Sequence, residues 1–151
     1  MAETKKVEVT LVGIFCENAD DGPGNELEIF GSLYTNIHSA SPDGHLISSH
    51  PMWRVTRDNC VYIAEGNVLQ IKNRQTVDLN EDEQLALGGY LKEYDPGRFP
   101  SDNINDDNMG NEAVWIKYSE INQNIRHYQV PFSNFGQRVS VEYTVHGSPS
   151  S

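Results

Sequence analysis

The sequence has little cysteine, few basic residues and no long apolar run, and each shortage excludes a class of protein. Only Cys16 and Cys60 are present among 151 residues, so disulfides are not the source of stability, and we expect two buried thiols. No stretch approaches the roughly 18 apolar residues that span a bilayer. Residues 1–6 lead into a strand-like segment without the apolar core of a signal peptide, so we expect a soluble chain.

Basic residues are outnumbered two to one. The chain has 11 Lys and Arg against 22 Asp and Glu, which gives a formal net charge of -11. A field of that sign repels the phosphate backbone of nucleic acids, so we expect no nucleic-acid partner. The same charge opposes binding to an anionic membrane unless a cation first neutralises part of the surface.

Apolar and polar residues alternate with period two along much of the chain, which predicts strands. Near the end of the chain, Val139, Val141, Tyr143 and Val145 alternate with polar residues. Turn residues such as Gly, Pro and Asp separate the strands. The other predicted strands are residues 7–11, 27–35, 52–56, 60–64, 67–73, 85–94, 113–118 and 126–132.

This pattern predicts an all-β fold, a single antiparallel β-sandwich of about eight or nine strands. We expect the sandwich to cover residues 1–146 and a disordered polar tail to follow at residues 147–151. The segment 80–94 also carries helix-start signals. Gly88 and Gly89 would destabilise such a helix by about 2 kcal/mol relative to alanines, so we predict a strand there.

The acidic residues are concentrated in two turn-rich segments. The first has five acids within twelve residues that contain no Lys or Arg, and the second has six within twenty residues that contain only Arg98. The first group is Glu17, Asp20, Asp21, Glu26 and Glu28, and the second is Glu93, Asp95, Asp102, Asp106, Asp107 and Glu112. Like charges this close repel one another, so either solvent with counterions or a bound cation must compensate them.

Calcium fits the chemistry of both segments. It takes roughly six to eight oxygen ligands from carboxylates, amides and backbone carbonyls. Amides stand among the acids at Asn18, Asn25, Asn103, Asn105 and Asn108. Zinc and copper prefer His and Cys, and magnesium usually needs a phosphate partner. The EF-hand pattern is missing, so we predict a calcium site made by loops of the sandwich.

In two stretches of the chain, a predicted strand is followed by a group of acids and then by a second predicted strand. Residues 87–95 end on Asp95 and are followed by an acidic stretch that closes on Asp107-Asn108-Met109-Gly110, while residues 11–30 enclose the first group of acids. This order resembles that of the synaptotagmin-type calcium/lipid-binding domain, a β-sandwich first named in protein kinase C as conserved region two. The resemblance covers most of the chain in outline and rests on about 40 residues.

The resemblance implies calcium ligands from two loops. Asp20 or Asp21 and then Glu26 match the first loop, and Asp95 and Asp107 match the outer aspartates of the last loop. The chain departs from the family at Gly97, where an aspartate is usual, and in a longer last loop. It also has no Lys-rich strand of the kind that this family uses for acidic lipid headgroups.

We therefore predict a non-catalytic recognition module in which two acidic loops at one end of the sandwich bind calcium and order a surface for a partner. That partner is membrane lipid, a glycan or a protein. Phe99 and Met109 are the candidate exposed apolar tips that contact it; the alternative is that they fold back and pack over the end of the sandwich. The principal ligands would be Asp20, Asp21, Glu26, Asp95, Asp106 and Asp107, assisted by Glu17, Asn18, Asp102 and Asn105.

Three other roles stay open. The same sandwich could be an assembly subunit of a toxin, virus or surface layer that calcium stabilises. Glu17 and Glu93 could face each other as the paired carboxylates of a glycoside hydrolase, although the five His residues are scattered and no nucleophile motif appears. A sugar-stacking platform could form from Trp53, Trp115, Tyr94 and Tyr118, but aromatic residues in strands usually belong to the core.

Overall fold

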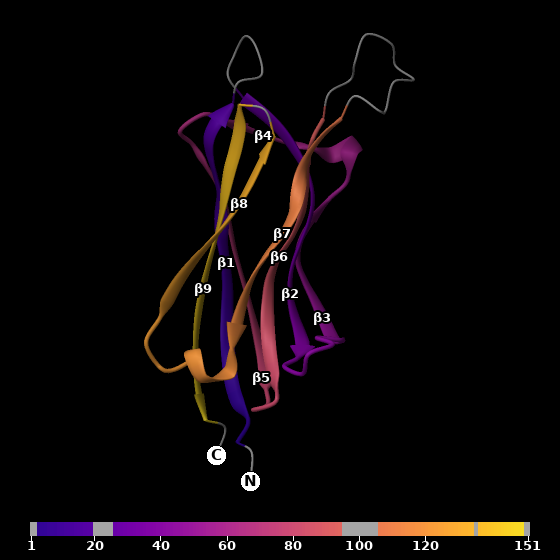
Figure 1. The fold of residues 1–151 in the computed structure, drawn as a ribbon. Helices are drawn as coiled ribbons and strands as arrows, with labels where there is room; N and C mark the ends of the chain where they lie inside the picture. The colour runs from indigo at the N-terminus through magenta and orange to yellow at the C-terminus, as the bar shows by residue number, and fades with distance from the viewer. Residues whose placement is uncertain (1–2, 20–25, 95–105, 135, 150–151) are drawn as a thin grey trace.

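The computed structural model describes residues 3–19, 26–94, 106–134 and 136–149. In Figure 1 these residues form two layers of long antiparallel strands, and the two ends of the chain lie at the same end of the molecule. The fold class predicted from the alternation is therefore confirmed. The described chain contains β1 (Lys5–Ala19), β2 (Glu26–Ser39), β3 (Leu46–Val55), η1 (Arg57–Asn59), β4 (Val61–Ala64), β5 (Val68–Leu79), β6 (Glu83–Glu93), β7 (Asp107–Lys117), η3 (Tyr118–Glu120), β8 (Arg126–Asn134) and β9 (Gln137–Pro149).

The two sheets have four and five strands. The first has the order β5-β1-β9-β8, and the second has the order β3-β2-β6-β7 with β4 also paired to β2. Strands β3 and β4 share one edge of β2: β3 pairs along residues 31–38 and β4 along residues 26–29. All of these pairings are antiparallel.

Alternating side chains of the two sheets meet in one core. Val7, Val9 and Leu11 of β1 are fully buried, and so are Val139 and Val141 of β9. Each fully buried side chain of this size stabilises the fold by roughly 1.5–3 kcal/mol relative to leaving it exposed. The period-two pattern of the sequence thus identified the inner faces of the first and last strands.

Gly88 and Gly89 lie in the middle of β6, which is a strand and not a helix. Both have a positive φ, 154° and 152°. A Cβ at Gly88 would lie 2.0 Å from the carbonyl oxygen of Glu112 on β7, and one at Gly89 would lie 1.9 Å from that of Ser32 on β2. Glycine is required here because β6 packs closely between two neighbouring strands.

The structure corrects the predicted boundary of the sandwich. Strand β9 continues to Pro149, and Gly147 and Ser148 pair with Val7 and Lys6 of β1. The amide of Gly147 also donates to the carbonyl oxygen of Asn122, at 2.7 Å. The polar composition of residues 147–149 suggested disorder, but backbone pairing with β1 holds these residues in the sheet. Residues 150 and 151 lie outside the described residues.

Candidate functional site

The strands that bracket the two acidic segments end at the same pole of the sandwich. Glu93 of β6 pairs in register with Asp107 of β7, and Gln137 of β9 pairs with Ala19, the last residue of β1. The Gln137 side chain connects these two pairs across the sheets. We call the end formed by Ala19, Glu26, Glu93, Asp107 and Gln137 the acidic pole.

Two carboxylates at the acidic pole share one amide donor. The Nε2 of Gln137 lies 3.2 Å from Oδ2 of Asp107 and 3.4 Å from Oε1 of Glu93. The Glu93 side chain is fully buried and its Oε2 accepts a hydrogen bond from the backbone amide of Glu28, at 3.3 Å. Carboxylates are rarely fully buried unless they are paired, and Glu93 accepts hydrogen bonds from both the Gln137 side chain and the Glu28 amide.

The other end of the Gln137 amide has no partner. Its Oε1 is buried and makes no hydrogen bond, and the residue is only 4% exposed. Carboxylates only accept hydrogen bonds, so they turn the NH₂ group of the amide toward themselves and leave the oxygen over. A buried polar atom without a partner is unusual in a folded protein. The described residues contain one other, Oδ1 of Asn36 on β2.

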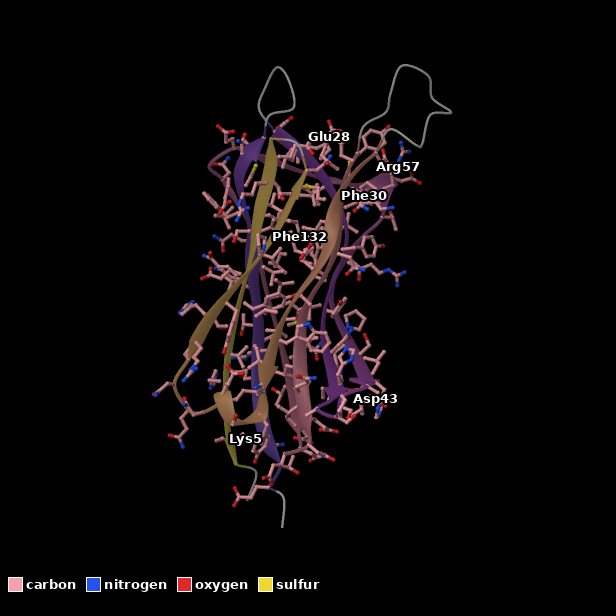
Figure 2. The ribbon with its side chains drawn as sticks, viewed as in Figure 1. Lys5, Glu28, Phe30, Asp43, Arg57 and Phe132 are labelled. Carbon is pink, nitrogen blue, oxygen red and sulfur yellow. The ribbon has the colours of Figure 1, made fainter. Side chains whose placement is uncertain are left out.

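Two other acids near this pole are paired with arginines of the chain. Asp106 accepts hydrogen bonds from Nε and Nη2 of Arg57, at 2.5 and 3.3 Å, and this bond raises the pKa of the Arg57 guanidinium. Arg57 also lies over the ring of Tyr94, 4.3 Å from its centroid. Glu17 accepts a hydrogen bond from Nε of Arg138, at 2.5 Å. Figure 2 shows Arg57 at the same end of the molecule as Glu28.

Burial and nearby acids raise the pKa of three side chains at this end. Burial raises the pKa of the Cys16 thiol to about 11, with further contributions from Glu65 and Glu17. Glu28 is the main cause of the raised pKa of Tyr62, and burial followed by Glu28 raises that of Cys60. Both cysteines are free thiols, Cys16 buried and Cys60 partly exposed.

The exposure of four predicted site residues can be compared. Glu26 and Asn18 are exposed at the start of β2 and near the end of β1, and Asp106 and Asp107 are partly exposed at the start of β7. The predicted residues Asp20, Asp21, Asp95, Phe99, Asp102 and Asn105 lie outside the described residues.

Met109 is not an exposed tip. Its side chain is 1% exposed and belongs to the hydrophobic core, because β7 begins at Asp107 and carries Met109 into the space between the sheets. The prediction that Met109 contacts a partner from the second acidic loop is therefore corrected.

The donor set of the pole suits a hard cation in part. Glu93, Asp107 and the unpartnered Oε1 of Gln137 all offer oxygen, which calcium prefers. Among residues 3–19, 26–94, 106–134 and 136–149, no group of three or more His, Cys, Asp or Glu side chains is arranged to hold a metal ion. The described residues thus offer oxygen atoms of the kind that calcium takes, but by themselves they are too few to form a calcium site.

Sequence reasoning missed Glu93 and Gln137 as members of the site. Glu93 was counted among the acids, but only the sheet shows that it is buried opposite Asp107. Its position two residues before Asp95 could have indicated it, because alternate residues of a strand lie on the same face. Gln137 gave no signal, because it comes from a distant turn that the topology brings to this pole.

The predicted alternatives fare differently. Glu17 is paired with Arg138 at the surface while Glu93 is buried with Gln137, so the two carboxylates have separate partners. Of the four aromatic residues, Trp53 and Tyr118 pack against the core and Tyr94 lies under Arg57. Trp115 is 50% exposed, so the four do not share one exposed face. In the described part of the chain, no helix has the length and apolar character needed to cross a bilayer.

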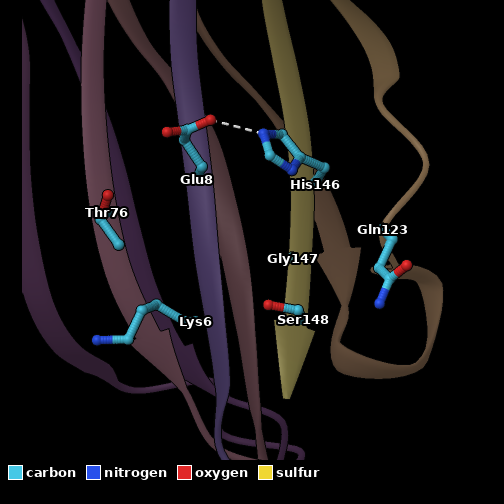
Figure 3. A pocket seen from close by; sticks show the side chains of 7 residues that line it. All are labelled: Lys6, Glu8, Thr76, Gln123, His146, Gly147 and Ser148. Carbon is cyan, nitrogen blue, oxygen red and sulfur yellow. Dashed lines mark hydrogen bonds and ion pairs between the residues drawn. The ribbon is translucent and has the colours of Figure 1, made fainter. Parts of the chain in front are cut away.

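Three surface hollows of about 440 to 510 Å³ lie away from the acidic pole. The one of about 440 Å³ lies on the outer face of the first sheet, where Oε2 of Glu8 and Nε2 of His146 form a hydrogen bond of 2.6 Å (Figure 3). It is lined by Lys6, Glu8, Thr76, Gln123, His146, Gly147 and Ser148. This hollow is separate from the acidic pole in both sequence and partners.

Neither a protein-family model nor a curated protein matches the sequence. Among solved structures, the C2A domain of plant extended synaptotagmin 1 matches with a TM-score of 0.53 and 12% identity, over 99% of this chain and 96% of that chain. Human GIVD cytosolic phospholipase A2 matches with a TM-score of 0.48 and 11% identity, over 100% of this chain and 16% of the enzyme chain. The chain thus has a distant C2-like fold, which confirms the resemblance at the level of the fold.

Proposed function

We propose that the chain is a calcium-binding recognition module whose acidic pole binds calcium and, through the ion, the phosphate headgroups of anionic membrane lipids. One observation supports it above the others: the ends of four strands that bracket the acidic segments meet around Glu93, Asp107 and Gln137. In this proposal Asp20, Asp21, Glu26, Asp95, Asp102 and Asn105 supply further ligands, assisted by Asn18. Asp106 and Glu17 would join them only by leaving Arg57 and Arg138.

The charge of the chain makes lipid binding dependent on the ion. A net charge of -11 repels an anionic membrane, and a divalent ion held by carboxylates offers open coordination positions to phosphate oxygens. A C2-like fold is consistent with this chemistry. We favour lipid over a glycan because three of the four aromatic residues that would stack on sugar rings are engaged with the core or with Arg57. The fourth, Trp115, is exposed but pairs with Ala86, several residues along β6 from Glu93.

Calorimetric titration of the chelator-treated chain with calcium chloride, and separately with magnesium chloride, tests the ion. We expect saturable calcium binding, weaker magnesium binding and a calcium-induced rise in Tm. The double variant Glu93→Gln with Asp107→Asn should lose most of that rise, whereas Glu8→Gln, far from the pole, should keep it. An equal rise in the double variant would place the site elsewhere.

Vesicle sedimentation tests the partner. The chain should sediment with vesicles of phosphatidylserine and phosphatidylcholine in calcium, and should stay in solution with pure phosphatidylcholine or with chelator. Binding of calcium without vesicle binding would contradict the lipid part of the proposal. A stable oligomer in light scattering that ignores chelator would favour the assembly-subunit alternative.

A further inference from the structure

Gln137 has a fixed backbone and a side chain that bridges the two sheets. Its backbone pairs with Ala19 of β1 on one side and with Asn134 of β8 on the other. Its amide reaches across the core to Glu93 and Asp107 of the second sheet. The residue is 4% exposed, so the side chain is held by the protein and not by solvent.

The orientation of the Gln137 amide depends on the charges beside it, and in this orientation its oxygen has no hydrogen bond. With two carboxylates as neighbours, the NH₂ group faces inward and makes two long hydrogen bonds, of 3.2 and 3.4 Å, while Oε1 stays buried without a partner. A cation placed beside the carboxylates would reverse this preference, because it attracts the carbonyl oxygen and repels the NH₂ group. Turning a carboxamide about its last torsion exchanges nitrogen and oxygen with little change in shape.

We infer that Gln137 is both the internal substitute for the ion and one of its ligands. Without calcium, its amide nitrogen holds Glu93 and Asp107 together and limits their repulsion. When calcium enters, the amide turns, its oxygen joins the ligands and the unpartnered atom gains a partner. This inference rests on the proposed function, because it assumes that calcium binds at the acidic pole.

Three substitutions of Gln137 have distinct expected results. Gln137→Met keeps the size but removes both polar atoms, so calcium affinity should fall about tenfold, as when other supporting groups of metal sites are lost. Gln137→Lys adds a permanent cation between the carboxylates, so the Tm without calcium should rise and calcium binding should disappear. Gln137→Glu adds a third carboxylate, so the Tm without calcium should fall and its rise on calcium addition should grow.

The measurements are calorimetric titration of the full chain with calcium chloride and the Tm in chelator. Gln129 on β8 is exposed and supplies the matched controls Gln129→Met and Gln129→Lys, which should keep the calcium affinity of the original chain. A purely structural role for Gln137 would lower the Tm in chelator without changing calcium affinity. Circular dichroism in the near ultraviolet verifies that each variant is folded.

The outcomes separate this inference from the proposed function. If the original chain binds calcium but Gln137→Met stays within threefold of its affinity, or Gln137→Lys still binds, the inference is overturned and the proposed function stands. An equal loss in the Gln129 variants also overturns it. If the original chain shows neither heat nor a Tm rise with calcium, both fail together.

Discussion

The two ends of the sandwich satisfy their charged side chains in different ways. At the end near the chain termini, Nζ of Lys5 donates to the carbonyl oxygens of Tyr118 and Ile121, at 2.8 and 2.7 Å, and lies 4.0 Å from the centroid of the Tyr118 ring. Figure 2 shows Lys5 and Arg57 at opposite ends of the molecule. At the acidic pole the buried Glu93 and its neighbour Asp107 share an uncharged amide.

The two ends thus differ in whether a charged side chain is matched by neutral carbonyls or carboxylates by a neutral amide. Lys5 donates to the carbonyls of Tyr118 and Ile121 at the end of η3. Gln137 hydrogen-bonds the carboxylates but adds no charge, and one of its own atoms is left without a partner. In the proposed function, a cation from solution would supply the charge that the amide of Gln137 does not.

Removing the cation at the terminal end should have the largest effect on stability. Lys5→Met leaves two carbonyl oxygens without their charged donor and removes the contact with the Tyr118 ring, so we expect the free energy of unfolding to fall by about 2 kcal/mol. Urea unfolding measures this change. Its neighbour Lys6→Met, on the exposed face of β1, is the control and should change stability little. Calcium affinity should be the same in both variants; a loss in Lys5→Met would mean that the two ends are coupled.

Asp106 and Asp107 are adjacent, yet neutralising each should have an opposite effect. Asp106→Asn removes the charge that pairs with Arg57, so the Tm in chelator should fall by a few degrees. Asp107→Asn removes one of two like charges around Gln137, so the Tm in chelator should rise while the calcium-induced rise shrinks. Differential scanning calorimetry in chelator and in calcium measures both. Shifts of the same sign in chelator would show that the two acids share one environment.

At neutral pH the smallest expected effect comes from Cys16, because the shifted pKa of its thiol changes stability only above about pH 8.5. Burial, Glu65 and Glu17 raise its pKa to about 11 in the folded chain, above the value of about 8.5 for a thiol in the unfolded chain. Below about pH 8.5 the thiol is protonated in both the folded and the unfolded chain, and stability is not reduced. As the pH rises toward 11 only the unfolded chain releases the proton, so the free energy of unfolding falls. The slope cannot exceed about 1.4 kcal/mol per pH unit for one proton. Chemical unfolding from pH 8 to 10, compared with Cys16→Ala, isolates it, and parallel pH profiles would contradict the assignment.

Most of the fold was predictable because it depends on local patterns. Each of the nine predicted strands has a counterpart among β1 to β9, since alternation and turn residues are local in sequence. Gly88 and Gly89 predicted a strand by excluding a helix, but the close approach of Glu112 and Ser32 that requires them was visible only in the sheet. Residues 147–149 were misjudged because their pairing partner, β1, is at the other end of the chain.

The candidate site was predictable only as a composition. The clustering of acids indicated a cation and the segments that would hold it, and the strand order placed the bracketing ends together. Composition could not distinguish Asp106, which Arg57 neutralises, from Asp107, which it does not. Nor could it show that Met109 points into the core, since the end of a loop and the first residues of a strand look alike in sequence.

The amino-acid sequence by itself determined the all-β class, the inner faces of the strands and an acidic surface without matching basic residues, because hydropathy period and charge are carried by each segment alone. Tertiary structure decided which acids stay with an arginine, that Glu93 is buried, and that Gln137 reaches both Glu93 and Asp107. These are contacts between residues up to 121 positions apart, and such contacts depend on strand order and register, which no local pattern specifies.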